Sequence, residues 1–260
     1  MELFTALTFS VGVNLLMFIP AFLLKTDKLT DISYALTFAF VAVYGLFSGI
    51  VNLPNIILAS MIVLWAVRLG TYLLIRIRKM GRDERFDVMR EDFLKFGRFW
   101  LLQGITVWVV LLPSIMFFGN KVERISPFSF LGVVVWALGL SIEAVADMQK
   151  YQFINDPENK GQWIDSGLWR YSRHPNYFGE ILNWVGIYLF TVYGLRPWQA
   201  VLGLLSPIYI SGLLIFVSGI PILEKEADKR WGDNEEYRKY KRETSVLVLL
   251  PHKQREKYED

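Results

Sequence analysis

The sequence predicts an all-α polytopic membrane protein with seven transmembrane helices. Of the 260 residues, 53% are hydrophobic, the mean hydropathy is +0.32, and long apolar runs alternate with charged loops. Soluble domains average about 45–50% apolar residues with glycine included, so this chain is too apolar for that class. The formal charge of +3 gives no reason to expect a nucleic-acid partner, and the absence of cysteine excludes disulfide scaffolds and Cys-ligated metals. With two histidines in the chain, we expect no metal site.

A helix that crosses a bilayer needs roughly 20 mostly apolar residues. Seven runs approach this length, at residues 3–24, 32–51, 56–75, 99–118, 129–147, 178–194 and 198–222. The first run lacks a basic n-region and a clear cleavage site, which favours an uncleaved span over a signal peptide. We expect one membrane domain over residues 1–260, with a cytosolic segment at 223–260.

The basic residues predict the orientation. Of the 28 Lys and Arg residues, 24 fall in one set of loops and three in the opposite set, while Arg68 lies inside a span. Positively charged loops stay in the cytosol. The N-terminus is therefore predicted outside and the C-terminus in the cytosol. The long loops are all on the cytosolic side, so we expect the active site there.

The third run contains an ionisable residue, Arg68, followed by Tyr72 and Arg76 on the same helical face. A charged group inside a span is a candidate functional residue. The alternative is that Arg68 extends its side chain toward the cytosolic headgroups.

Glu143 and Asp147 lie one helical turn apart near the inner end of the fifth run. Two carboxylates on one face repel each other, so they need a cation, a hydroxyl-rich ligand or protonation. A ribose could donate hydrogen bonds to both. The alternative for Asp147 is that it ends the helix in water.

The densest polar motif runs from Gly167 to Glu180. Pro175 suits the first turn of a helix, which places Arg173 and His174 at its N-terminus, where phosphate groups bind well. Asn176, Glu180 and Asn183 then form a polar stripe, which must face the bundle interior or a ligand. The alternative is a polar contact between helices.

Two charged segments flank the spans on the cytosolic side. Residues 76–85 are basic, which fits either phosphate binding or attraction to anionic lipids. The segment from Glu224 to Arg242 is predicted to be helical at both ends and broken near Gly232, as a cap on the cytosolic mouth or a solvated helix. The apolar residues 246–251 need a surface to pack on, which favours a lid docked on the bundle.

These motifs resemble the bacterial branch of the steroid 5-alpha-reductase superfamily. The resemblance covers most of residues 60–251 and rests on residues 68–72, 81–85, 147–150, 167–180 and 224–240. It implies a seven-helix bundle that binds NADPH on the cytosolic side and reduces a carbon–carbon double bond conjugated to a ketone.

The resemblance also implies the residues that bind the cofactor. Asn176 and Glu180 match positions near the cofactor amide and ribose, Asp147 matches a ribose-binding aspartate, and Arg82 matches a phosphate-binding arginine. Together with the residues singled out above, the candidate cofactor-binding set is Arg82, Glu143, Asp147, Arg173, His174, Asn176, Tyr177, Glu180 and Glu224.

The chain departs from the eukaryotic steroid reductases at the substrate ketone. Residues 32–51 contain no Gln-Glu pair, and Arg68 stands at the position of a tyrosine, with Tyr72 one turn on. Arg68 and Tyr72 are therefore our candidate catalytic residues, as donors to the ketone oxygen.

The expected partners are the lipid bilayer and a lipid-like substrate that enters from it. The alternative function is an S-adenosylmethionine-dependent membrane methyltransferase of the isoprenylcysteine or phospholipid type, which shares the Arg-His-Pro motif at residues 173–175. A transporter is a further alternative, but no inverted repeat is evident. The bacterial resemblance and the lack of an ER-retention signal favour a bacterial inner membrane.

Overall fold

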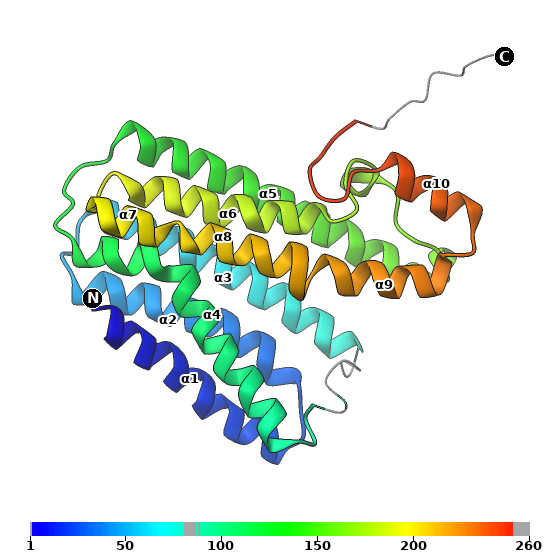
Figure 1. Ribbon diagram of the computed structural model, residues 1–260, viewed down its shortest axis with the longest axis horizontal. Helices are drawn as coiled ribbons and strands as arrows, with labels where there is room; N and C mark the ends of the chain where they lie inside the picture. The colour runs from blue at the N-terminus through cyan, green and yellow to red at the C-terminus, as the bar shows by residue number, and fades with distance from the viewer. Residues whose placement is uncertain (1, 81–86, 88, 252–260) are drawn as a thin grey trace. The chain divides into compact units, whose positions relative to one another are not determined.

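The computed structural model describes residues 2–80, 87 and 89–251, and 79% of the chain is helical. The described residues contain no named strand, only an isolated bridge between Ser172 and Ser245. The helices are α1 (Leu3–Leu23), α2 (Lys28–Ser48), α3 (Leu53–Met80), α4 (Phe93–Gly119), α5 (Pro127–Asn155), α6 (Pro175–Val192), α7 (Pro197–Gly203), α8 (Leu205–Gly212), α9 (Ile220–Trp231) and α10 (Glu235–Glu243) (Figure 1).

Six helical segments are long and apolar enough to cross a membrane: α1, α2, α3, α4, α5 and the stretch Pro197–Trp231. They contain six of the seven predicted runs, and the protein is therefore an integral membrane protein. The predicted span 178–194 falls mainly on α6, which is not one of the six. That helix has 18 residues and carries Asn176, Glu180 and Asn183. The seventh span and the orientation of the termini stay predictions.

Several helices continue beyond the apolar runs that predicted them. α3 runs on to Met80, α4 begins at Phe93, and α5 runs on to Asn155. At the start of α4, the Asp92 carboxylate accepts hydrogen bonds from two backbone amides of the first turn. Such a cap satisfies amides that have no partner inside the helix.

The chain folds as two compact units. Unit 1 comprises residues 1–136 and 184–209, and unit 2 comprises residues 137–183 and 210–260. Within unit 1, α1 packs on α2 and α4, and α2 packs on α3. Unit 2 contains the second part of α5, the first part of α6, α9 and α10.

An aromatic cluster joins three helices of unit 1. Phe38 on α2, Trp65 on α3 and Trp184 on α6 are fully buried, and their ring centroids lie 4.7–5.1 Å apart. Tilted and edge-to-face aromatic pairs add about 0.5–1.5 kcal/mol beyond the burial of their area.

Polar side chains join α1, α2 and α4 inside unit 1. The Gln103 amide on α4 donates to Asn14 Oδ1 on α1 at 2.8 Å, and Asn14 donates to Thr37 Oγ1 on α2 at 3.2 Å. In an apolar medium such hydrogen bonds between helices substitute for the hydrophobic driving force that water supplies.

Ion pairs connect the loops at one end of unit 1. Arg90 pairs with the buried Asp27 at 3.2 Å and also with Asp87. Arg76, the first residue of the predicted basic segment 76–85, pairs with Asp31 at 3.2 Å. Arg76 therefore has an acidic partner within the protein.

Glycines bring the backbones of α5 and α6 into contact. A Cβ atom on Gly139 would lie 2.7 Å from the Gly179 carbonyl oxygen, within unit 2. In unit 1, a Cβ atom on Gly132 would lie 2.6 Å from the Gly186 carbonyl oxygen. Both distances are too short for any side chain, so the two helices need glycine at these positions. Small residues at such contacts are typical of packed membrane helices.

The last apolar stretch is not one regular helix. α7 and α8 are followed by a π-helical turn at Leu213–Val217, and α9 begins at Ile220 after a break at Ser218 and Gly219. Pro207 and Pro221 cannot donate helical hydrogen bonds, which contributes to the irregularity.

We predict that Gly139→Val strongly lowers the thermal stability of the detergent-solubilised protein. The valine side chain would meet the backbone of α6, and overpacking of this kind costs about 1–3 kcal/mol. Gly12→Val on α1 is the matched control, because a Cβ atom there has nothing within 4 Å. Equal unfolding midpoints for the two variants would contradict the close packing of α5 on α6.

Candidate functional site

The segment before α6 is fixed to α5. The Leu168 amide donates to Gln149 Oε1 at 2.9 Å, and the Trp169 indole donates to the Ala146 carbonyl at 3.1 Å. Gly167 has a positive φ of 60°, and a Cβ atom there would collide with the Gln149 side chain. α6 then begins at Pro175, which confirms the predicted helix start.

Two carboxylates of α5 accept hydrogen bonds from two amides of α6. Glu143 is 2% exposed and accepts from Asn183 Nδ2 at 2.8 Å. Asp147 is 4% exposed and accepts from Asn176 Nδ2 at 3.2 Å. Asp147 therefore does not end the helix in water, and the polar stripe of α6 makes a helix–helix contact. The side-chain oxygen of Asn183, Oδ1, is buried without a hydrogen-bond partner among the described residues.

Glu224 on α9 is a shared partner of three basic side chains. Its Oε1 atom lies 2.9 Å from His174 Nε2 and 3.4 Å from Arg173 Nε, and its Oε2 atom lies 3.0 Å from Lys241 Nζ. The Arg173 guanidinium also donates to the Lys241 carbonyl at 2.9 Å. The Glu224 carboxylate thus connects α9, the N-terminus of α6 and α10.

His174 is an enclosed imidazole. Its side chain is 7% exposed and stacks on Tyr177, with ring centroids 5.7 Å apart and planes inclined by 11°. Burial lowers the pKa of His174 below 6.5, and the hydrogen bond and charge of Glu224 offset this only in part. The imidazole is therefore neutral at pH 7. Its Nδ1 atom is buried without a hydrogen-bond partner in the described part of the chain.

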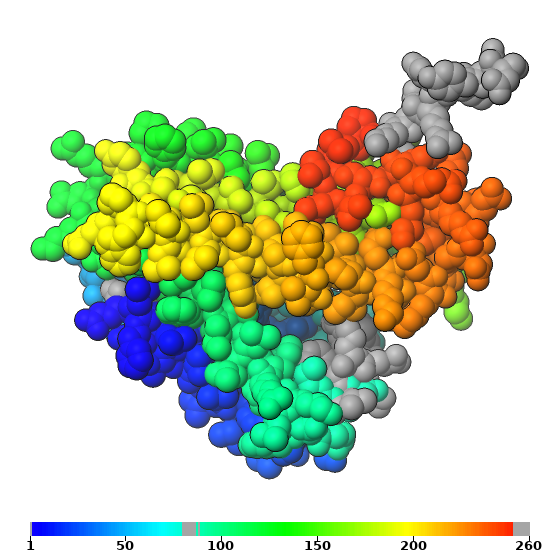
Figure 2. All heavy atoms as spheres, in the orientation of Figure 1, coloured from blue at the N-terminus to red at the C-terminus, as the bar shows by residue number. Residues whose placement is uncertain are grey.

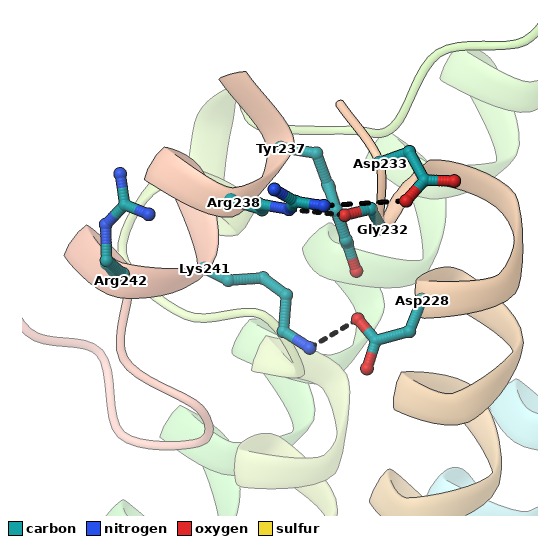
Figure 3. Close-up of a pocket in the computed structure, with 7 residues that line it drawn as sticks. All are labelled: Asp228, Gly232, Asp233, Tyr237, Arg238, Lys241 and Arg242. Atoms are coloured by element: carbon teal, nitrogen blue, oxygen red, sulfur yellow. Dashed lines mark hydrogen bonds and ion pairs between the residues drawn. The ribbon is translucent and has the colours of Figure 1, made fainter. Parts of the chain in front are cut away.

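α9 and α10 form a hairpin with a break at Gly232, as predicted. Residues of the hairpin line an open pocket of about 560 Å³ (Figure 3). Lys241 Nζ lies 2.6 Å from Asp228 Oδ1, and Arg238 donates to the Gly232 carbonyl. Burial alone would lower the pKa of Lys241, but its hydrogen bonds to Asp228 and Glu224 outweigh that effect and raise it. Lys241 and Arg238 are thus engaged within the hairpin.

The residues after α10, 245–250, form an irregular segment with an isolated bridge at Ser245 and bends at 246–248, which we call the strap. Three hydrogen bonds hold it against residues 171–173. They run from the Arg173 amide to the Ser245 carbonyl (2.8 Å), from the Ser172 hydroxyl to the Leu247 carbonyl (2.7 Å), and from the Leu250 amide to the Tyr171 carbonyl (3.2 Å). The predicted docking of this segment is therefore present, but the strap contributes backbone groups to these three bonds and none of its apolar side chains.

Most of the candidate cofactor-binding residues lie in unit 2. α5, the segment before α6, α6 and α9 supply them: Glu143, Asp147, Arg173, His174, Asn176, Tyr177, Glu180 and Glu224. Tyr177 and Glu180 are partly buried on the first turns of α6. Arg82 lies outside the described residues. No group of three or more His, Asp or Glu residues within the described ranges is placed to hold a metal ion.

The candidate catalytic residues lie in unit 1, one turn apart on α3. Arg68 and Tyr72 are both partly buried, and the Nε and Nη2 atoms of Arg68 are shielded from solvent. The guanidinium is therefore packed against protein, and the alternative of a side chain extended into the headgroups is disfavoured.

Sequence reasoning missed several residues of this network. Lys241 and Asp228 lie in a run of mixed charges, where nothing in the sequence distinguishes a residue of the ion-pair network from one that contacts only water. Asn183 was part of the predicted stripe but not of the candidate cofactor-binding set, although its position one turn beyond Glu180 was a usable signal. Trp169, which is 4% exposed, had no polar pattern to mark it.

The fold and the site thus define an all-helical integral membrane protein with a buried polar cluster at one end of α5 and α6. The chain belongs to the family described as "Protein of unknown function (DUF1295)", which matches residues 17–244. This family is related to steroid 5-alpha-reductase-like membrane proteins. No curated protein and no solved structure matches the chain.

We predict that the protein becomes less stable as the pH falls below 6.5. The unfolded chain then binds a proton at His174 that the buried imidazole does not bind, at a cost of at most about 1.4 kcal/mol per pH unit until the lowered folded-state pKa is reached. Unfolding midpoints between pH 7.5 and pH 5.5 measure this slope. In His174→Gln the slope should be smaller, and an unchanged slope would show that His174 does not cause it.

Proposed function

We propose that the protein is an NADPH-dependent membrane reductase of the steroid 5-alpha-reductase superfamily. It would transfer hydride to a carbon–carbon double bond conjugated to a ketone, in a steroid-like or lipid-like substrate. The relation of its family to steroid 5-alpha-reductase-like membrane proteins supports this class. The positive-inside pattern supports an active site facing the cytosol of a bacterial inner membrane.

The observation that carries the proposal is the pair of buried carboxylate–amide contacts between α5 and α6. Asp147 and Glu143 offer carboxylate oxygens that ribose hydroxyls can donate to. The buried Oδ1 atom of Asn183 has no hydrogen-bond partner among the described residues, and an amide N–H of the cofactor could donate to it. Buried polar atoms without partners are rare, and each calls for a ligand, a water or a structural reason.

The basic residues near the N-terminus of α6 would hold the anionic part of the cofactor. The Arg173 guanidinium suits a phosphate, because its planar set of donors can bind two oxygens at once. The neutral His174 donates from Nε2 to Glu224, so its Nδ1 atom is an acceptor that suits a ribose hydroxyl and not a phosphate. Glu224 orients both side chains through the contacts described above. The donor set thus fits a nucleotide with ribose, amide and phosphate groups.

When bound, NADPH supplies the hydride that adds to the β-carbon of the conjugated substrate. Arg68 and Tyr72 would donate hydrogen bonds to the ketone oxygen as negative charge develops on it. Preorganised donors of this kind are commonly the largest catalytic contribution. The α-carbon then takes a proton from Tyr72 or from water, which balances the reduction.

Ligand-induced thermal shifts test the cofactor. We expect NADPH to stabilise the detergent-purified protein, by about 2.7 kcal/mol at a hundredfold excess over its dissociation constant. The shift should weaken in Asp147→Asn and Asn176→Ala, but not in the matched control Gln152→Ala, whose exposed side chain lies further along α5. A parallel titration with NADH shows how much the 2′-phosphate of NADPH contributes to the thermal shift.

S-adenosylmethionine is the discriminating ligand in the same titration. Stabilisation by S-adenosylmethionine alone would overturn the reductase proposal in favour of the methyltransferase. The absence of any NADPH shift in protein that elutes as a single folded species would also overturn it.

Substitution of the proposed donors tests the chemistry separately from cofactor binding. With a 3-oxo-Δ4 steroid as the probe substrate, Arg68→Ala and Tyr72→Phe should each lower the rate of NADPH oxidation roughly 10²–10³-fold. The NADPH thermal shift should persist in both variants. Leu64→Ala, whose side chain is 55% exposed on the same helix, is the control. Full turnover in the double variant would contradict the assigned roles.

A further inference from the structure

The strap presents apolar side chains that stay exposed among the residues the structure describes. Every second residue of the strap is exposed. Val246, Val248 and Leu250 alternate along it and are 42%, 45% and 51% exposed. Tyr171, on the segment that the strap pairs with, is 43% exposed. A contiguous apolar face rimmed by polar residues marks an interaction surface.

Hydrogen bonds connect the strap, through residues 169–173, to α5. The strap is bonded to residues 171–173, and the adjacent Trp169 is bonded to the Ala146 carbonyl of α5. α5 is one of the six helices able to cross a membrane, and its apolar run ends at residue 147. With α5 in a bilayer over that run, we expect the strap near the boundary between the hydrocarbon region and the headgroups.

The lipid-facing surface of α5 supports the same depth. Leu138, Val145 and Met148 are 56%, 45% and 59% exposed and recur at helical spacing on that helix. Their apolar side chains face the bilayer in a spanning helix. Exposed apolar residues are therefore present both on α5 and on the strap.

The part of α10 next to the strap is basic. Residues 238–242 include four Lys and Arg and no Asp or Glu. Arg238 and Lys241 are engaged within the hairpin, whereas Lys239 and Arg242 are exposed. Figure 2 shows α10 and the strap side by side on the surface of unit 2. An apolar face beside exposed basic residues suits a membrane surface that contains anionic lipids.

We propose that the strap is a membrane-surface contact, with Val246, Val248 and Leu250 inserted at the boundary between headgroups and acyl chains. Lys239 and Arg242 pair with the phosphates of anionic lipids. This contact would hold the C-terminal hairpin against the bilayer, and with it Glu224 and its basic partners. The inference does not depend on the reductase proposal, because it uses only the membrane span of α5 and the surface of unit 2.

The cysteine-free chain allows a direct test by spin labelling. Single-cysteine variants Val246→Cys, Val248→Cys and Leu250→Cys of the full chain are labelled and placed in nanodiscs of phosphatidylcholine mixed with phosphatidylglycerol. Leu138→Cys is the reference for lipid exposure. Asp233→Cys, whose side chain is fully exposed on the hairpin, is the reference for water. Gel filtration confirms that each variant is folded.

The expected result is a ratio of oxygen to nickel-chelate accessibility several-fold above that of Asp233→Cys at all three strap positions. A ratio equal to that of Asp233→Cys would place the strap in water and overturn the proposal. Spin–spin broadening between copies, removed by dilution with unlabelled protein, would assign the face to a second copy of the chain and also overturn it.

A comparison of nanodiscs with and without phosphatidylglycerol tests the role of anionic lipids. Protection of the strap labels from the nickel chelate should be greater with phosphatidylglycerol than in phosphatidylcholine alone. That gain should disappear in the Lys239→Gln, Arg242→Gln background and persist in the control Lys160→Gln, which lies exposed on the loop after α5. Equal protection in both lipid compositions would overturn the assignment of the basic residues to anionic headgroups.

Discussion

Backbone contact between α5 and α6 sets the chemistry of the buried site. Glycine at positions 139 and 179 lets the two helices approach until a side-chain amide on one reaches a carboxylate on the other. A buried carboxylate without hydrogen bonds would cost several kcal/mol, so Glu143 and Asp147 depend on this separation. Asn183 donates from Nδ2 in this contact, while its Oδ1 atom has no hydrogen-bond partner among the described residues. This is the acceptor that we propose for the cofactor.

An ion-pair cluster around Glu224 connects parts of the chain that are distant in sequence. The Glu224 carboxylate faces Arg173, His174 and Lys241, which come from the segment before α6 and from α10. A single anion among several donors is stable where water is scarce, because the opposite charges compensate the loss of hydration. The cluster couples the position of the C-terminal hairpin to the N-terminus of α6, where the proposed cofactor phosphates would bind.

Much of the fold could be predicted from hydropathy, because six of the seven predicted runs lie in helices able to span a membrane. α6 is the exception, since its polar stripe lowers its hydropathy while satisfying the carboxylates of α5. Local signals also predicted the helix start at Pro175 and the break at Gly232. Pairings such as Asn183 with Glu143 could not be predicted, because they depend on which helices become neighbours. The strap was predicted to dock, but its apolar side chains face outward.

The π-helical turn at Leu213–Val217 and the break at Ser218 and Gly219 together set the rotational phase of α9. A π-turn holds one residue more than an α-helical turn, which rotates everything after it by about 100° around the helix axis. Glu224 follows that turn by seven residues, beyond the break at Ser218 and Gly219. The extra residue thus helps to determine whether an acidic or a basic side of α9 is presented to Arg173 and His174. A chain one residue shorter here would keep its composition and its hydropathy, yet bring a different side chain to the cluster.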